Sequence, residues 1–243
     1  MNALVVPGSR RATGEERGRP LWVSVEGING VGKTTAVRAT ASALGSRCLP
    51  LDELTDLAAD TLPGRVIAAL SAKDDVCLRT GHPVVETLAL LALKAREVER
   101  LHLTPGLLAG VDVIVEDRGV DSVAVCQGAI LHAEHPATPA RAVADYILAT
   151  ARRWRPMPDV TLLLTADREV CLGRFATRIG RTLPPDAVEI IEHTEQLYRE
   201  LATAEPERYT VIDVTGCGPQ ETGKAVADAV LAIVDHKEVE RAS

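Results

Sequence analysis

The chain has 243 residues and a mass of 25.9 kDa, which is enough for one α/β domain with a substantial buried core. Hydrophobic residues make up 46% and charged residues 25%, a balance that excludes a disordered chain and a bundle of membrane-spanning helices. The formal net charge of −7 and the lack of a dense Lys/Arg block argue against nucleic acid or an anionic membrane as a partner. An anionic ligand would therefore need a local binding site.

The amino-terminal segment, 1–20, mixes Arg and Glu with Gly and Pro and has no apolar stretch of signal-peptide length. We expect it to be a disordered tail before a single kinase-like domain at 21–243. The five cysteines are an odd number, widely spaced and without a CxxC pair, so we expect reduced thiols in a cytoplasmic protein. No apolar run approaches the length of a membrane span.

Short apolar runs predict β-strands at 21–26, 47–51, 112–116, 159–164 and 209–214. Helical patterns fill the intervals, at about 53–71, 84–103, 120–131, 139–153, 168–178, 187–203 and 220–236. Strands that alternate with helices predict an α/β fold with a five-stranded parallel sheet and helices on both of its faces.

The first strand leads into GINGVGKT (27–34), which fits the phosphate-binding pattern GxxxxGK(S/T) between a strand and a helix. The glycines allow successive backbone N–H groups to converge on a phosphate, and the helix N-terminus adds the positive end of its dipole. Lys33 would reach the β- and γ-phosphates of ATP, and the Thr34 hydroxyl would ligate Mg²⁺. The predicted nucleotide-binding residues are Gly27, Asn29, Gly30, Val31, Gly32, Lys33, Thr34 and Thr35.

The apolar strand VIVED (113–117) ends in carboxylates and lies beside the first strand in the predicted sheet. Asp117 is the candidate for holding Mg²⁺ together with Thr34, and a helix N-cap is the alternative interpretation.

Three arginines, Arg174, Arg178 and Arg181, follow each other at helical spacings of four and three. Guanidinium groups on one helix face could neutralise the charge of a transferred phosphoryl group, whereas the alternative is a solvated basic face. The series runs into a Gly and Pro-Pro break at 180–185, as a short lid over ATP would.

Three stretches together resemble the thymidylate kinase family, namely VEGINGVGKTT (25–35), EDRGVDSVAVCQG (116–128) and PDVTLLLTADREVCLGRFATR (158–178). The resemblance spans about 21–236. It implies a P-loop kinase fold with a short arginine-bearing lid, ATP and Mg²⁺ as cofactors, phosphoryl transfer to a nucleoside monophosphate and usually a homodimer. The catalytic residues that it implies are Lys33, Asp117, Arg118, Arg174, Arg178 and Arg181.

By motif position, Arg118 would contact the acceptor and the transferring phosphate. Arg96, matched to the arginine of the family's FxAxR helix, and Gln127 would face the acceptor base, with Ser122 beside them. Glu26 belongs to the neighbourhood of the phosphate-binding loop and is a further candidate site residue.

The sequence departs from the family pattern at the acceptor site. By the same match, Ala92 stands where the family has a phenylalanine that stacks on thymine, Asn29 replaces an acid that faces the acceptor sugar, and Gly119 replaces a tyrosine or histidine. Stacking of a base on an aromatic ring contributes about 1–3 kcal/mol in nucleic-acid sites. We therefore expect a preferred acceptor other than dTMP.

The segment LPLDELTD (49–56) lacks the arginine that the family presents to the acceptor phosphate, and it carries Asp52 and Glu53. A carboxylate repels a phosphate dianion but can act as a general base for a hydroxyl. The leading hypothesis is a nucleoside monophosphate kinase. The alternative is a kinase that phosphorylates a hydroxyl of a nucleoside or specialised small metabolite with Asp52 or Glu53 as the base. A regulatory P-loop module is a third, and no NKxD guanine motif supports it.

Overall fold

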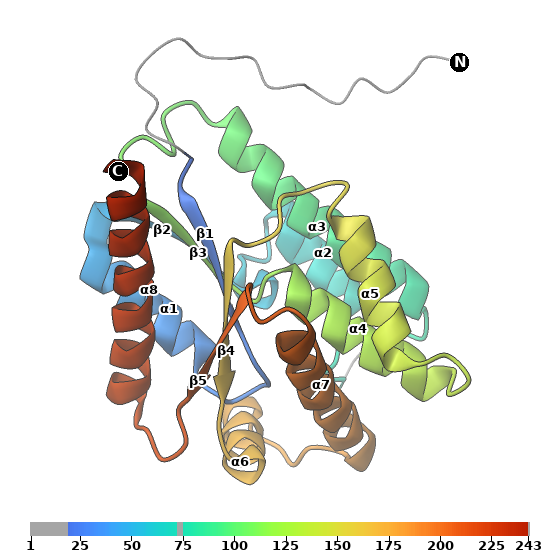
Figure 1. Ribbon diagram of the computed structural model, residues 1–243. Coiled ribbons are helices and arrows are strands. Elements are labelled where there is room, and N and C mark those ends of the chain that lie inside the picture. The colour runs from blue at the N-terminus through green and yellow to red at the C-terminus, as the bar shows by residue number, and fades with distance from the viewer. Residues whose placement is uncertain (1–18, 72–74, 243) are drawn as a thin grey trace, which may run out of the picture.

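The strands within the described part of the chain form one parallel sheet in the order β2-β3-β1-β4-β5 (Figure 1). The structure is a computed structural model that describes residues 19–71 and 75–242. The strands are β1 (Leu21–Glu26), β2 (Cys48–Leu51), β3 (Val113–Asp117), β4 (Val160–Thr165) and β5 (Tyr209–Asp213). Each lies within one residue of its predicted bounds, and the predicted α/β fold class is confirmed.

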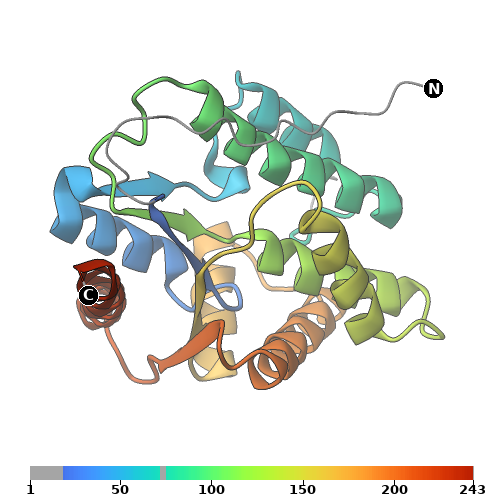
Figure 2. The same cartoon turned by 45° about the horizontal axis from the view of Figure 1, so that its top comes forward.

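Helices cover both faces of the sheet, as Figure 2 shows. On one face lie α1 (Lys33–Leu44) and α8 (Pro219–Ala242), which pack against each other. On the other lie α3 (Pro83–Leu103), α4 (Val120–Glu134), α5 (Ala140–Ala151) and α7 (Pro185–Ala204). The helix α6 (Arg168–Ile179) follows β4 at the carboxyl end of the sheet.

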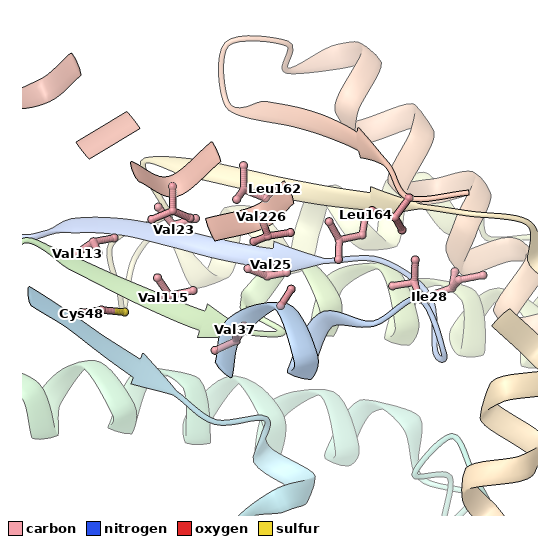
Figure 3. Packing of buried hydrophobic residues seen from close by; sticks show 14 of the residues in the cluster. Val23, Val25, Ile28, Val37, Cys48, Val113, Val115, Leu162, Leu164 and Val226 are labelled. Carbon is pink, nitrogen blue, oxygen red and sulfur yellow. The ribbon is translucent and has the colours of Figure 1, made fainter. Parts of the chain in front are cut away.

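The core between the sheet and the helices α1 and α8 is built from aliphatic side chains (Figure 3). Val25 and Val115 from neighbouring strands and Leu164 from the next meet Val37 of α1 and Val226 of α8. On the opposite face of β1 and β3, Trp22 and Ile114 pack with the carboxyl-terminal half of α3. Strands buried on both faces explain why the sequence reads as short continuous apolar runs.

The window 53–71, predicted as one helix, is broken. A 3₁₀ turn, η2 (Leu54–Asp56), follows β2, and α2 (Leu62–Leu70) begins only after Thr61, whose hydroxyl accepts a hydrogen bond from the Gly64 N–H at 3.2 Å. A proline at the second position of α2 also marks a helix start. The chain therefore turns once at the sheet edge before α2.

A buried ion cluster ties β3 to α3 and to the segment after α5. The Glu116 carboxylate receives two hydrogen bonds from the Arg155 guanidinium, at 2.9 and 2.8 Å, and one from Trp22 Nε1 at 2.8 Å. Lys94 Nζ lies 3.1 Å from Glu116 Oε1 and 3.0 Å from Glu97 Oε2. These contacts fix α3 against the sheet.

The expected tail lies, for 1–18, outside the described residues. Arg19 belongs to the folded part, since its guanidinium donates to Asp159 Oδ2 at 2.9 Å. All five cysteines are free thiols; Cys48 and Cys171 are buried, whereas Cys77, Cys126 and Cys217 are half-buried. Over the described ranges, no helix combines the length and apolarity needed to cross a membrane.

Candidate active site

The phosphate-binding loop joins the carboxyl end of β1 to α1, and its glycines are required by the backbone. Gly30 has a φ of 84°, and a Cβ there would lie 2.0 Å from the Cys171 carbonyl oxygen of α6. Gly27 has a φ of 137°, and a Cβ there would lie 2.6 Å from the Leu164 carbonyl oxygen of β4. The loop is therefore wedged between β4 and α6, and the glycines make this close approach possible.

Lys33 heads α1 with its ammonium folded onto the loop. Its Nζ donates to the carbonyl oxygens of Gly27, at 2.9 Å, and Ile28, at 2.8 Å. Burial, together with the nearby Arg118 guanidinium, lowers the pKa of Lys33 to about 7. The Lys33 amine thus lies at the loop on which a phosphate would rest.

Asp117 ends β3 beside the loop with an unsatisfied carboxylate. Both oxygens are buried and neither forms a hydrogen bond of normal geometry, and burial raises the pKa of the group above its usual value. The Thr34 side chain lies close enough to act on that pKa. A buried orphan carboxylate next to a threonine hydroxyl fits Mg²⁺, which takes one or two protein oxygens and completes its shell with phosphates and water. Within the described residues, no three His, Cys, Asp or Glu side chains gather into another metal site.

Two cavities open at this end of the sheet. The first, of about 210 Å³, we call the phosphate-loop cavity. The second, of about 180 Å³, we call the apolar cavity because aliphatic side chains dominate its lining. Glu53 and Arg118 line both. Beyond these two, the phosphate-loop cavity is lined by Gly30, Val31, Gly32, Lys33, Thr34, Thr35, Arg174, Arg178, Pro219 and Thr222.

Arg118 stands where the two cavities meet. It has a φ of 59°, an uncommon value for a residue with a side chain, directly after β3. Its Nε lies 3.0 Å from Glu53 Oε1, and its guanidinium also donates to the Asn29 side chain. Although burial opposes it, the Arg118 and Lys33 charges hold the pKa of Glu53 below its usual value. An ionised pair therefore separates the two cavities.

Glu26 lies behind this junction and lines neither cavity. Its fully buried carboxylate accepts from the Gly119 N–H and the Tyr198 hydroxyl, each at 2.7 Å, and from Ser24 and Ser122. Burial and the neighbouring Asp121 raise the pKa of Glu26. The structure therefore gives Glu26 a role in holding the turn that carries Arg118, in place of the substrate contact expected from the sequence.

Gln127 and Ser122 of α4 line the apolar cavity, and their contact with an acceptor stays a prediction. The Gln127 side-chain oxygen accepts from the Thr87 hydroxyl of α3 at 3.0 Å. Asn29 also lines this cavity and not the phosphate-loop cavity, where the sequence placed it, while Gly27 lines neither. Among the described lining residues none is aromatic.

The register of α3 differs from the sequence-based match by two residues. Ala92 is exposed and Arg96 is half-buried, and neither lines a cavity. Leu90 and Lys94 take the inward positions on the apolar cavity. Lys94, which was not among the residues predicted from the sequence, therefore lines the cavity in place of Arg96, while its ammonium lies in the ion cluster with Glu116 and Glu97.

The acidic and arginine candidates divide between site and surface. Glu53 is at the junction, whereas Asp52 is exposed and lines neither cavity. Arg174 and Arg178 of α6 face the phosphate-loop cavity, whereas Arg181 is exposed outside it.

The predicted lid is a helix with an anchored turn. The helix α6 ends at Gly180 in the left-handed conformation, and Leu183 is buried in the core beyond it. The amino-terminal half of α7 then returns to the apolar cavity with Ile190, Ile191 and Thr194. Their i, i+1, i+4 spacing is typical of one buried helix face and could have indicated from the sequence that these residues face the interior.

A phosphate-binding loop at the carboxyl edge of a parallel sheet, with an adjoining second cavity and arginines between them, defines a P-loop kinase of small molecules. The chain belongs to the thymidylate kinase family, whose sequence model matches residues 25–221. It is accordingly a nucleoside monophosphate kinase, an enzyme that transfers a phosphoryl group from ATP to a nucleoside monophosphate.

Relatives support this placement over most of the chain. Thymidylate kinase from Caulobacter vibrioides is 29% identical over 225 residues, covering 90% of this chain and 96% of that protein. Thymidylate kinase from Clavibacter michiganensis subsp. michiganensis is 32% identical over 200 residues, covering 79% and 86%. The solved structure of thymidylate kinase from Candida albicans matches the fold with a TM-score of 0.62 and 17% identity, covering 90% of this chain and 93% of that one.

Proposed function

We propose that the chain transfers the γ-phosphoryl group of ATP to the phosphate of a nucleoside monophosphate whose base occupies the apolar cavity, and that dTMP is not the preferred acceptor. The observation that carries the proposal is the shared wall of the two cavities. Because Arg118 and Glu53 line both, a donor phosphate in one cavity and an acceptor phosphate in the other meet at Arg118.

The donor side is assembled from α1 and α6. Lys33 leaves the loop carbonyls and binds the β- and γ-phosphate oxygens, while the loop N–H groups bind the β-phosphate. Thr34 and Asp117 would hold Mg²⁺, which neutralises phosphate charge when bound. Arg174 and Arg178 of α6 line the same cavity and would bind phosphate oxygens there.

Arg118 neutralises the charge that spreads over the transferred group. An oxygen of the acceptor phosphate forms a bond to the γ-phosphorus as the bond from that phosphorus to the β,γ-bridging oxygen breaks. ADP leaves with the electron pair of that bond, and no covalent intermediate with the protein is required.

The aliphatic lining of the apolar cavity is the support for an acceptor other than dTMP. Without an aromatic ring, a thymine base forgoes stacking of about 1–3 kcal/mol, which corresponds to about 5-fold to 150-fold in affinity. Leu90 lines the cavity at the position where the sequence-based match placed Ala92, in place of the stacking phenylalanine of the family. Base recognition would then depend on shape and on the Gln127 amide.

The test is a mass-spectrometric endpoint assay with ATP and Mg²⁺ and matched panels of nucleoside monophosphates, nucleosides and hydroxyl-bearing metabolites. We expect diphosphates from monophosphates, with kcat/KM for the best acceptor at least tenfold above that for dTMP. A dTMP value equal to the best would contradict the acceptor preference. Phosphorylation of unphosphorylated compounds alone, abolished by Glu53→Gln, would replace the proposal with the hydroxyl kinase in which Glu53 is the base.

We also propose that the chain works as a homodimer in the cytoplasm. An exposed apolar stripe along α3 supports the dimer, since Val84, Val85 and Leu88 are 61%, 60% and 58% exposed and Ala92 continues the same face. Five free thiols support a reducing compartment.

A further inference from the structure

One wall of the apolar cavity is a short segment, 75–82, that precedes α3. Its residues Val76, Cys77 and Leu78 line the cavity. Ile190 and Ile191 of α7 line it as well, from a helix more than a hundred residues further along the chain. The width of the cavity therefore depends on how this segment is held relative to α7.

Leu78 is held in a backbone conformation that leucine seldom adopts. Its φ is 58°, in the left-handed region that disfavours residues with a Cβ. Such a conformation persists only where the surroundings over-determine it, and it is a reason to look for function at that place. Because the Leu78 side chain lines the apolar cavity, its unusual backbone conformation helps to shape that wall of the cavity.

Two carboxylates hold the segment on either side of Leu78. Asp75 Oδ1 accepts from the Cys77 N–H at 2.6 Å and from the Arg79 N–H at 3.3 Å. Fully buried Glu86 of α3 accepts through Oε1 from the Thr80 N–H at 2.5 Å and from the Thr80 hydroxyl at 2.7 Å. The segment is thus fixed to itself and to α3.

Arg79 supplies the contact to the opposite wall. Its Nε lies 2.7 Å from Asp75 Oδ2, and its terminal nitrogen lies 2.8 Å from Asp186 Oδ2 in the first turn of α7. The Arg79 side chain is 23% exposed and that of Asp186 is 57% exposed, so the bridge is shielded at its Arg79 end and open to solvent at its Asp186 end. One guanidinium therefore joins the two walls.

We propose that Arg79 is a positioning residue that sets acceptor selectivity, because it ties the segment 75–82 to α7 and so fixes the width of the apolar cavity. The identity of the ligand in that cavity rests on the proposed function, whereas the bridge itself rests on the contacts above. Loss of the bridge should let Leu78 relax and the two walls separate. The phosphate-loop cavity has no lining residue in common with this wall and should be unaffected.

Cys77 provides a readout that needs no catalysis. Burial raises the pKa of its thiol to about 12, so a closed wall keeps it poorly reactive. We would compare the wild type with Arg79→Gln and measure labelling by N-ethylmaleimide at each cysteine by peptide mass spectrometry. The matched control is Arg141→Gln, which removes an Arg–Asp pair of the same 2.8 Å length on the outer face of α5.

We expect Arg79→Gln to speed labelling of Cys77 at least tenfold while the buried Cys48 and Cys171 stay at the wild-type rate, and Arg141→Gln to change none of them. An unchanged Cys77 rate would overturn the proposal. Faster labelling of all cysteines together would also overturn it, because that pattern reports general unfolding.

Kinetics with the best acceptor provide the second arm. Arg79→Gln should raise the acceptor KM about tenfold and narrow the kcat/KM differences among acceptors, with kcat and the KM for ATP unchanged. Equal losses for all acceptors and for ATP would contradict a role in selectivity.

The same labelling experiment separates this proposal from the proposed function. If nucleoside monophosphates slow Cys77 labelling in the wild type but Arg79→Gln does not speed it, the positioning role of Arg79 is wrong. The placement of the acceptor in the apolar cavity is then still supported. If Arg79→Gln speeds labelling while no monophosphate protects Cys77, the positioning role of Arg79 is supported and the placement of the acceptor in the apolar cavity is wrong.

Discussion

At the residue scale, the pKa of Lys33 links nucleotide binding to protonation. The side chain is almost fully buried against two loop carbonyls, and burial with the Arg118 charge lowers its pKa to about 7. A bound polyphosphate places several negative charges next to the amine and favours its protonated form. Binding and protonation are therefore linked at this position.

Proton uptake on nucleotide binding follows from that linkage. At pH 8 a group with a pKa of about 7 is mostly neutral, so binding of a non-hydrolysable ATP analogue should take up about 0.9 proton at Lys33. At pH 6 about nine-tenths of the amine is already charged, and the uptake at Lys33 should fall to about 0.1 proton. Titration calorimetry in buffers of different ionisation enthalpy measures this number.

The control is Lys224→Met, which removes an exposed lysine of α8 outside both cavities and should keep the uptake. Lys33→Met should abolish it. A binding enthalpy independent of buffer at pH 8 in the wild type would show that Lys33 is already charged in the free protein.

At the element scale, Glu116 joins β3 to α3 and to the segment that carries Arg155. Although burial opposes ionisation, the Arg155 and Lys94 charges hold the pKa of Glu116 at about 2. Because the folded-state pKa lies below the unfolded value, this stabilisation is present above about pH 4.5 and is lost as the pH falls toward 2.

We expect Glu116→Gln to lower the free energy of unfolding at pH 7 by about 3–5 kcal/mol, since it leaves Arg155 and Lys94 buried without their main counter-charge. The loss should shrink as the pH falls from 4.5 to 2. Urea unfolding at several pH values measures both effects. Glu99→Gln, on the exposed side of α3, should change little, and a similar loss in that control would contradict the prediction.

The strands and the phosphate-binding loop could be predicted from the sequence because each carries a local signal. Strands such as β1 and β4 are short apolar runs, and the loop has a pattern whose glycines the backbone itself requires. The break in the window 53–71 also had a local signal that could have predicted it, since Thr61 and Pro63 are typical of a helix start.

The register of α3 was not readable in the same way. Apolar residues occupy nearly every position from Val84 to Ala95, so periodicity cannot tell the inward face from the exposed stripe. The two-residue shift that exchanges Arg96 for Lys94 is decided by the ion cluster with Glu116, a contact between distant parts of the chain. The ion pair between Arg79 of the segment 75–82 and Asp186 could not be predicted either, because it also joins distant parts of the chain.

At the scale of the whole molecule, α3 has two apolar sides with different tasks. Thr87, Leu90 and Lys94 are buried and face the interior, whereas Val84 and Leu88 are exposed on the outer side. A second copy packed on the outer side would hold α3 against the acceptor cavity from behind. Dimerisation and acceptor binding should therefore be coupled through this helix.

The prediction is that Leu88→Glu gives a monomer of 25.9 kDa by light scattering where the wild type gives about twice that mass, because a charge in the centre of an apolar interface stays unpaired. The monomer should keep its KM for ATP, since the phosphate-loop cavity contains no residue of α3, and should have a raised KM for the acceptor. Val239→Glu, which places the same charge on an exposed valine of α8, is the control and should remain a dimer. A monomeric wild type would contradict the proposed homodimer. A Leu88→Glu variant that stays dimeric would show that the dimer interface lies on a face other than the apolar stripe of α3.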